Sequence, residues 1–116
     1  MGAPVKHLRM KPKYSPVMNA AEKRHKAWIK SLACIGCGVV GRSDAHHTLL
    51  SVPGKRWRRD HEYLIPVCPD CHQGKNGIHG IGNELTWCER NNVDIRAASN
   101  LRAESIELGI LTCLTA

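Results

Sequence analysis

Four of the six cysteines stand in two Cys-x-x-Cys pairs, separated by the thirty residues 38–67. A tight Cys-x-x-Cys turn presents two thiolates to one side of a loop, so two turns brought together supply four soft ligands for a tetrahedral Zn²⁺. A redox motif is expected instead as a single pair that opens a helix after a strand. The pattern therefore favours a structural zinc over redox chemistry or chance burial, with the ligands Cys34, Cys37, Cys68 and Cys71.

Three histidines accompany these pairs. His46 and His47 are adjacent between the two pairs, and His72 directly follows the last cysteine. Outside a completed zinc shell, such imidazoles can bind a second ion or activate water. A His-His pair taken alone is more often structural or exposed than catalytic, and His72 could instead replace one cysteine on zinc. The position of the pair between two cysteine turns favours chemistry, and four thiolates already complete the zinc shell.

Composition limits the size of the core and suggests a partner. The 116 residues suffice for one domain. With 4% aromatic residues and no Phe, its apolar core is expected to be small, and a bound metal would supply stability that the core lacks. The formal charge of +7 favours a polyanionic partner, most simply nucleic acid. Since no apolar signal segment opens the chain and no apolar run is long enough for a bilayer, we expect a reducing cytosol and no membrane role.

The N-terminal part of the chain is predicted to be an arm followed by a helix. Residues 1–18 are basic and contain prolines, a composition that buries little surface, so we expect an extended arm. Asn19 and Glu22 resemble a capping box, and apolar side chains at helical spacing follow. These features predict an amphipathic helix over residues 20–32.

The rest of the chain predicts a hairpin and two more helices. We expect a short strand and turn at 38–41, strands at 45–50 and 63–67, and a turn at Pro53-Gly54. Residues 73–82 are rich in glycine and predict a loop, and helical patterns follow at 83–91 and 95–108. The isolated Cys88 and Cys113 are expected to be small buried side chains.

The order of these motifs resembles that of the HNH nucleases, whose ββα-metal fold often carries a four-cysteine zinc. The resemblance covers residues 34–90, and within the superfamily it is greatest to the phage-borne group that includes the recombination-enhancement nucleases. It implies an α+β protein with flanking N- and C-terminal helices, a single domain over residues 19–116 and a core of about 34–90. The matching residues are Ala45-His46-His47, Asp60, Ile65-Pro66-Val67-Cys68 and Trp87-Cys88-Glu89.

The resemblance also implies roles for the histidines. His46 would bind the catalytic metal, His47 would be the general base, and His72 would be a further metal ligand. Many relatives place another histidine four residues later, where this chain has Asn76. Either Asn76 substitutes as a ligand or an insertion moves the role to His79, and the glycines of this segment favour His79.

One departure from the family concerns the residue that holds the base. Relatives often have Asn five residues before the second cysteine pair, where Tyr63 stands here. This leaves the orientation of His47 open. Possible substitutes for the missing Asn are Asp44, Asp60, His61 and Glu62.

Basic residues near the predicted site are candidate contacts for DNA phosphates. Such a run is usually a solvated loop, but beside a phosphodiesterase centre it would give salt-dependent, sequence-tolerant affinity. We expect Trp57 to anchor the hairpin rather than to stack on a base. The predicted DNA-binding residues are Lys55, Arg56, Arg58, Arg59 and Lys75.

Together these features lead to the hypothesis of a metal-dependent DNA endonuclease, for phage or prophage recombination, in the cytoplasm of a bacterial host. The catalytic ion would be Mg²⁺ or Mn²⁺, as is usual in the family, although imidazoles also suit Zn²⁺, Ni²⁺ or Co²⁺. Two alternatives remain. One is a non-catalytic zinc module that binds nucleic acid, and the other is an adaptor that contacts a phage or host recombination protein through residues 95–108.

Overall fold

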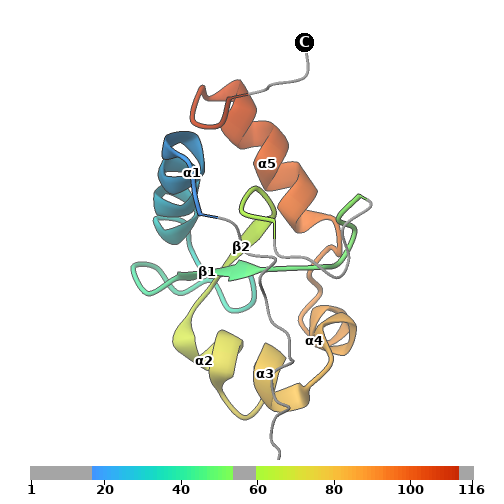
Figure 1. The fold of residues 1–116 in the computed structure, drawn as a ribbon. Helices are drawn as coiled ribbons and strands as arrows, with labels where there is room; N and C mark the ends of the chain where they lie inside the picture. The colour runs from blue at the N-terminus through green and yellow to red at the C-terminus, as the bar shows by residue number, and fades with distance from the viewer. Residues whose placement is uncertain (1–16, 54–59, 113–116) are drawn as a thin grey trace, which may run out of the picture.

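The computed structural model describes residues 17–53 and 60–112. Within these residues the chain forms a mixed α+β structure with one small sheet (Figure 1). The predicted α+β class is therefore confirmed. In chain order the elements are α1 (Ala20–Lys30), β1 (Asp44–His47), β2 (Leu64–Val67), α2 (Pro69–Gln73), α3 (Ile78–Ile81), α4 (Glu84–Arg90) and α5 (Ala97–Glu107).

Helix α1 begins as the sequence predicts. The Asn19 side chain accepts a hydrogen bond from the Glu22 backbone N–H at 2.8 Å, and the Glu22 carboxylate accepts one from the Asn19 N–H at 2.9 Å. This reciprocal capping box satisfies two backbone donors that the first helical turn leaves without partners. The helix ends at Lys30, two residues earlier than predicted.

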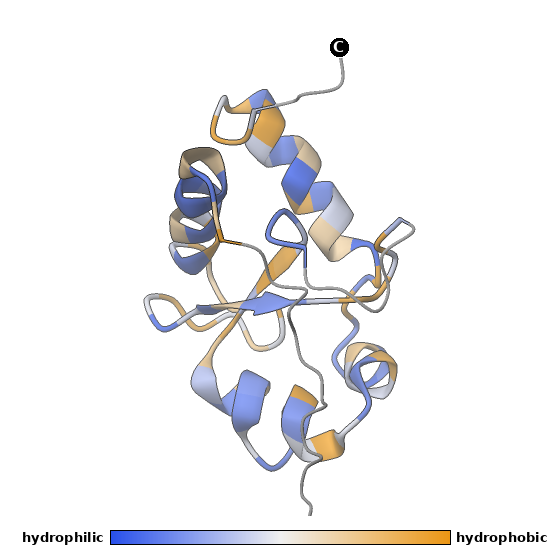
Figure 2. Ribbon diagram, in the orientation of Figure 1, coloured by the Kyte–Doolittle hydropathy of each residue, from blue (hydrophilic) through white to orange (hydrophobic). Residues whose placement is uncertain are grey.

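The two strands form an antiparallel hairpin with the register Asp44 to Val67 and His47 to Leu64. Every residue of β2 is buried, whereas β1 is only partly covered. Helices α1 and α5 contact the hairpin on one side, and α2, α3 and α4 lie on the other side (Figure 1). The hairpin therefore forms the centre of the molecule, and its apolar second strand is visible there in Figure 2.

The core extends from β2 toward α4 and the start of α5. Trp87 of α4 is completely buried and packs with β2 residues, with buried Cys88 beside it, as predicted for this cysteine. Cys113 lies outside the described residues. None of the helices in the described part of the chain is both long and apolar enough to cross a membrane.

Two local predictions were wrong. The strand expected within residues 38–41 is absent, because Gly38 and Gly41 have φ angles of +82° and +85°, and the backbone bends there instead of staying extended. The glycine-rich segment 73–82 is not all loop, because α3 lies within it. Pro53 lies in a turn as expected, and Gly54 lies outside the described residues, as do residues 1–16 of the predicted arm.

Candidate metal centres

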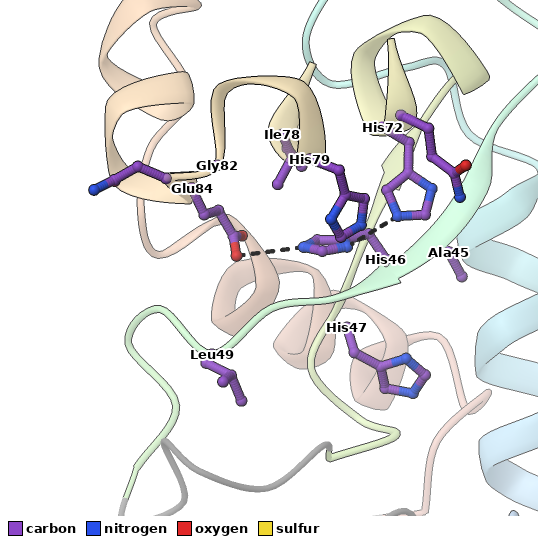
Figure 3. Close-up of a pocket in the computed structure, with 11 residues that line it drawn as sticks. Ala45, His46, His47, Leu49, His72, Ile78, His79, Gly82 and Glu84 are labelled. Carbon is purple, nitrogen blue, oxygen red and sulfur yellow. Dashed lines mark hydrogen bonds and ion pairs between the residues drawn. The ribbon is translucent and has the colours of Figure 1, made fainter. Parts of the chain in front are cut away.

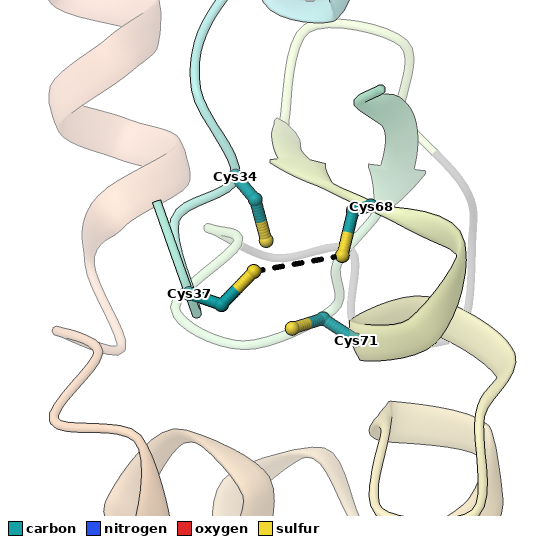
Figure 4. Close-up of side chains that lie close together, drawn as sticks. All are labelled: Cys34, Cys37, Cys68 and Cys71. Atoms are coloured by element: carbon teal, nitrogen blue, oxygen red, sulfur yellow. Dashed lines mark hydrogen bonds between the residues drawn. The ribbon is translucent and has the colours of Figure 1, made fainter. Parts of the chain in front are cut away.

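The four cysteines predicted to bind zinc lie together. Cys34 and Cys37 come from the turn after α1, and Cys68 and Cys71 come from the N-terminus of α2 (Figure 4). Their sulfur atoms all lie within 4.8 Å of one another, and the Sγ atoms of Cys37 and Cys68 are 3.7 Å apart. Ligands at about 2.3 Å from a tetrahedral zinc place their sulfurs about 3.8 Å apart. The cluster therefore has the size that a zinc ion requires.

Backbone hydrogen bonds shape the first cysteine turn. The Gly38 N–H donates to the Cys34 carbonyl at 2.8 Å, and the Cys34 N–H donates to the Val39 carbonyl at 2.9 Å. Gly36 sits against Trp87, because a Cβ at this position would lie 2.6 Å from the Trp87 ring and 3.1 Å from the Cys71 sulfur. The indole therefore packs directly on the cysteine cluster and leaves no room for a side chain at position 36.

The four thiols do not share one acidity. Burial raises the pKa of Cys34, but hydrogen bonds from the backbone of Cys68, Cys37 and Gly36 outweigh it and lower that pKa to about 6. Burial and the neighbouring thiols raise the pKa of Cys71. Cys34 therefore loses its proton more readily than Cys71, and the thiolate is the form that a metal ion needs.

A second cluster contains three histidines. His46 comes from β1, His72 from α2 and His79 from α3, and one ring nitrogen of each lies within 4.8 Å of the others (Figure 3). His46 Nδ1 is 3.2 Å from His72 Nε2, and the His79 ring centroid is 4.8 Å from that of His72 and 5.7 Å from that of His46. The cluster lines a cavity of about 590 Å³. Three converging imidazoles are a donor set for a divalent transition metal.

Close backbone packing brings His79 to this cluster. A Cβ on Gly80 would lie 2.1 Å from the Gly74 carbonyl oxygen, and one on Gly77 would lie 2.5 Å from the Asp70 carbonyl oxygen. Only glycine allows α3 to approach the end of α2 so closely. These glycines, which suggested a loop in the sequence, therefore permit the contact between two helices.

Two carboxylates lie behind the histidines. Glu84 Oε1 is 3.3 Å from His46 Nε2, and Glu84 Oε2 accepts a hydrogen bond from the buried Thr48 hydroxyl at 2.6 Å. Asp44 Oδ2 is 4.0 Å from His72 Nδ1. Burial and the neighbouring imidazoles His46 and His79 lower the pKa of His72, although both carboxylates act against this. The lowered pKa favours the neutral ring of His72, which is the form that binds a metal.

Sequence reasoning did not identify Glu84 or Thr48 as site residues. Glu84 directly follows the N-cap residue Asn83, a position where glutamate commonly stabilises a helix. Thr48 follows β1 and looks like an ordinary strand residue. No signal in the sequence links residues 48 and 84, because only the fold brings them together.

His47 lines the same cavity as the three histidines, but Figure 3 shows its ring on the far side of β1 from theirs. This follows from the strand, in which successive side chains point to opposite faces. His47 Nε2 lies 2.9 Å from Nδ1 of the buried His61. Of the candidate substitutes for the missing Asn, His61 thus contacts His47.

The segment that carries His61 is itself anchored. The buried His25 of α1 donates from Nε2 to the Glu62 carbonyl at 3.1 Å, and Arg102 of α5 donates to the Glu62 carboxylate at 2.6 Å. The Asp60 side chain accepts a hydrogen bond from the Glu62 N–H. Both flanking helices therefore fix the loop beside His47.

The other predicted site residues lie apart from the cluster or outside the described residues. Asn76 is exposed in the turn between α2 and α3 and is not among the described residues that line the cavity, whereas His79 is. The geometry thus favours His79 of the two alternatives. Lys75 is exposed in the same turn. Trp57 and the predicted DNA contacts Lys55, Arg56, Arg58 and Arg59 lie outside the described residues.

No family model, curated protein sequence or solved structure matches this chain.

The function must therefore be argued from the two side-chain clusters and their surroundings. Membership of the HNH superfamily stays a prediction of the sequence motifs.

Proposed function

We propose that this chain is a metal-dependent DNA endonuclease of the HNH type, in which the cysteine cluster holds a structural zinc and the histidine cluster holds a catalytic ion. The observation that carries the proposal is the convergence of His46, His72 and His79 at one cavity, which the next residue of β1, His47, also lines. A purely structural zinc module needs the four cysteines and has no use for this second donor set.

In the proposed reaction His47 is the general base. An imidazole that titrates near neutrality can accept a proton from the attacking water at cellular pH. His61 would hold the His47 ring through the 2.9 Å contact between their nitrogens. When bound, the divalent ion supplies charge stabilisation for the phosphoryl oxygens and the departing 3′ oxygen.

The donor set bears on the choice of ion. His46, His72 and His79 offer three imidazole nitrogens, which suit Zn²⁺, Ni²⁺ or Co²⁺, whereas Mg²⁺ and Mn²⁺ prefer oxygen ligands. The resemblance to HNH nucleases favours Mg²⁺ or Mn²⁺. We therefore propose that the test of activity include all of these ions.

The substrate assignment rests on charge. The net charge of +7 gives the chain an electrostatic attraction for the phosphate backbone, and the exposed Lys75 lies in the turn between the two helices that carry His72 and His79. We propose double- or single-stranded DNA as substrate, in the cytoplasm of a bacterial host if the chain is phage-encoded.

The test is cleavage of supercoiled plasmid by the purified protein with each divalent ion in turn, compared with His47→Ala. Because general base catalysis contributes about 10²–10⁴-fold, we expect the variant to lose at least about 100-fold in nicking rate. Glu107→Gln, an exposed change at the end of α5, is the control and should cut like the wild type.

Zinc content and circular dichroism would show that His47→Ala is folded. If the wild-type protein binds the plasmid and leaves it intact with every ion, the proposal fails and the non-catalytic binding module is supported. If neither binding nor cleavage occurs and a recombination protein is captured instead, the adaptor hypothesis is supported.

A further inference from the structure

Two ring nitrogens in the histidine cluster are buried without hydrogen-bond partners among the described residues, His46 Nε2 and His72 Nδ1. A buried donor or acceptor without a partner is unfavourable, because it has lost its hydrogen bonds to water. Both nitrogens belong to rings whose other nitrogen faces the neighbouring histidine. The unpartnered nitrogens therefore mark the outer side of the cluster.

The inner nitrogens are spaced as ligands of one ion would be. His46 Nδ1 and His72 Nε2 are 3.2 Å apart. Two nitrogens at about 2.0–2.1 Å from a common ion, at angles of about 90–110°, lie about 2.9–3.4 Å apart. A hydrogen bond between two imidazoles would have a similar length, but the His79 ring converges on the same point, which a simple pair would not require.

Each outer nitrogen faces a carboxylate. His46 Nε2 is 3.3 Å from Glu84 Oε1, and His72 Nδ1 is 4.0 Å from Asp44 Oδ2. The Glu84 contact is at ion-pair distance but falls short of hydrogen-bond alignment, which a small rotation of either side chain would supply. The Thr48 hydroxyl fixes the other oxygen of Glu84 and so limits where the carboxylate can move.

We propose that Glu84, held by Thr48, is a positioning residue that accepts the Nε2 proton of His46, so that His46 binds the ion through Nδ1 and His72 through Nε2. Asp44 acts on His72 through its charge, because 4.0 Å is too long for a direct hydrogen bond. A carboxylate behind a ligating histidine fixes its tautomer and raises its basicity. This inference rests on the metal site of the proposed function, but it does not depend on DNA cleavage.

The two carboxylates are expected to contribute unequally to metal affinity. The Glu84 side chain is 17% exposed and closer to its histidine, whereas the Asp44 side chain is 54% exposed. Water screens an exposed charge and competes for its hydrogen bonds. Glu84 should therefore contribute more to metal affinity than Asp44.

The first experiment is a calorimetric titration of Zn²⁺ into protein that already holds one equivalent of zinc. The Glu84→Gln variant should bind the second zinc about 10–100-fold more weakly than wild type, and Asp44→Asn should show a smaller loss. Glu89→Gln, an exposed change on the same helix α4, is the matched control and should leave the affinity unchanged. Equal affinity of Glu84→Gln and Glu89→Gln would overturn the proposal, as would the lack of a second zinc site in the wild type.

The second experiment reads the tautomer in the wild-type protein and so needs no variant to fold. Two-dimensional ¹⁵N–¹H spectra of the zinc-loaded, ¹⁵N-histidine-labelled protein should show a proton on Nε2 of His46 and metal-ligand shifts on Nδ1. The reverse assignment, with Nε2 of His46 on the metal, would make Glu84 a competitor or a ligand and would overturn the positioning role. Loss of nuclease activity with these spectra intact would count against the proposed function alone.

Discussion

His25 is the clearest case of a single residue whose surroundings decide its charge. Its ring is completely buried, with Nδ1 2.9 Å from the Ser105 hydroxyl and Nε2 3.1 Å from the Glu62 carbonyl. A carbonyl can only accept, so Nε2 carries the proton and Nδ1 accepts from Ser105. Burial lowers the pKa of His25 from its ordinary 6.5, and Arg102 acts in the same direction, while the Glu62 carbonyl and carboxylate oppose it.

Because the native pKa of His25 lies below the unfolded value of 6.5, the unfolded chain binds more protons as the pH falls. The contribution to stability is thus fully present above pH 6.5 and is lost as the pH falls through the native pKa. We expect the melting temperature of metal-saturated protein to fall between pH 7 and 5 more steeply for the wild type than for His25→Gln. Calorimetry at several pH values measures this difference.

Metal release in acid would destabilise both proteins equally, so the difference between the two slopes isolates His25. Gln is a suitable replacement because its amide can donate to the Glu62 carbonyl and accept from Ser105 without a titrating group. Parallel slopes for the two proteins would show that His25 does not titrate in this range.

At the residue scale the sequence indicated the reactive side chains but not their supporting partners. Spacing along the chain predicted the four cysteines, because a Cys-x-x-Cys turn is a local structure. His25 is eighty positions from Ser105 and Glu84 is thirty-six from Thr48. Such contacts depend on how the helices pack on the hairpin, which no local pattern encodes.

At the scale of elements, the pair α2 and α3 determines whether the third histidine reaches the site. The Gly80 Cα faces the Gly74 carbonyl, and an added Cβ would be 2.1 Å from that oxygen. Backbone cannot yield as the end of a flexible side chain can, so any side chain at position 80 must push α3 away from α2. His79 would move with it.

We therefore expect Gly80→Ala to weaken metal binding at the histidine cluster, while the zinc at the cysteine cluster is retained. Loss of one ligand from a three-histidine site should reduce metal affinity at least about tenfold. Mutation of a residue that only supports a ligand already reduces metal affinity by about 10–100-fold. Metal analysis together with a titration of the second ion measures both sites at once. Gly109→Ala, at a φ of +79° with open space around it, controls for the general cost of replacing a glycine.

Elements with local signals were predicted well and those shaped by packing were not. The capping box gave the start of α1, and Asn83 likewise caps α4, whose bounds lie within one residue of the prediction. Helix α3 was missed because Gly80 within it is a poor helix former, and the close approach that Gly77 and Gly80 permit is evident only when α2 lies against them. The same packing brings His79 to the other two histidines.

At the scale of the whole molecule, the cysteine cluster joins segments that are far apart in the sequence and also meet in the apolar core. It links the turn after α1 to the start of α2, and Trp87 of α4 covers it through contact at Gly36. The core has one completely buried tryptophan and otherwise mostly small or medium side chains. A protein of this size is stable by about 5–15 kcal/mol in general, while structural zinc binding contributes about 10–16 kcal/mol.

For the proposed occupancy of the two clusters, these magnitudes predict that the fold needs a zinc at the cysteine cluster but not an ion at the histidine cluster. Removal of all metal with a strong chelator should abolish the cooperative thermal transition and expose Trp87 to solvent, and zinc should restore both. His72→Ala should keep its first zinc and melt within a few degrees of the wild type, because the His72 side chain lines the cavity and is not part of the apolar core. Cys71→Ser should instead lose zinc and unfold, since it removes one of the four clustered thiol ligands. Calorimetry, tryptophan fluorescence and zinc content measure the three proteins side by side.

A cooperative thermal transition in the metal-free wild type, at a temperature near that of the metal-loaded protein, would contradict this prediction. It would mean that the apolar core alone stabilises the fold and that metal at the cysteine cluster is not required.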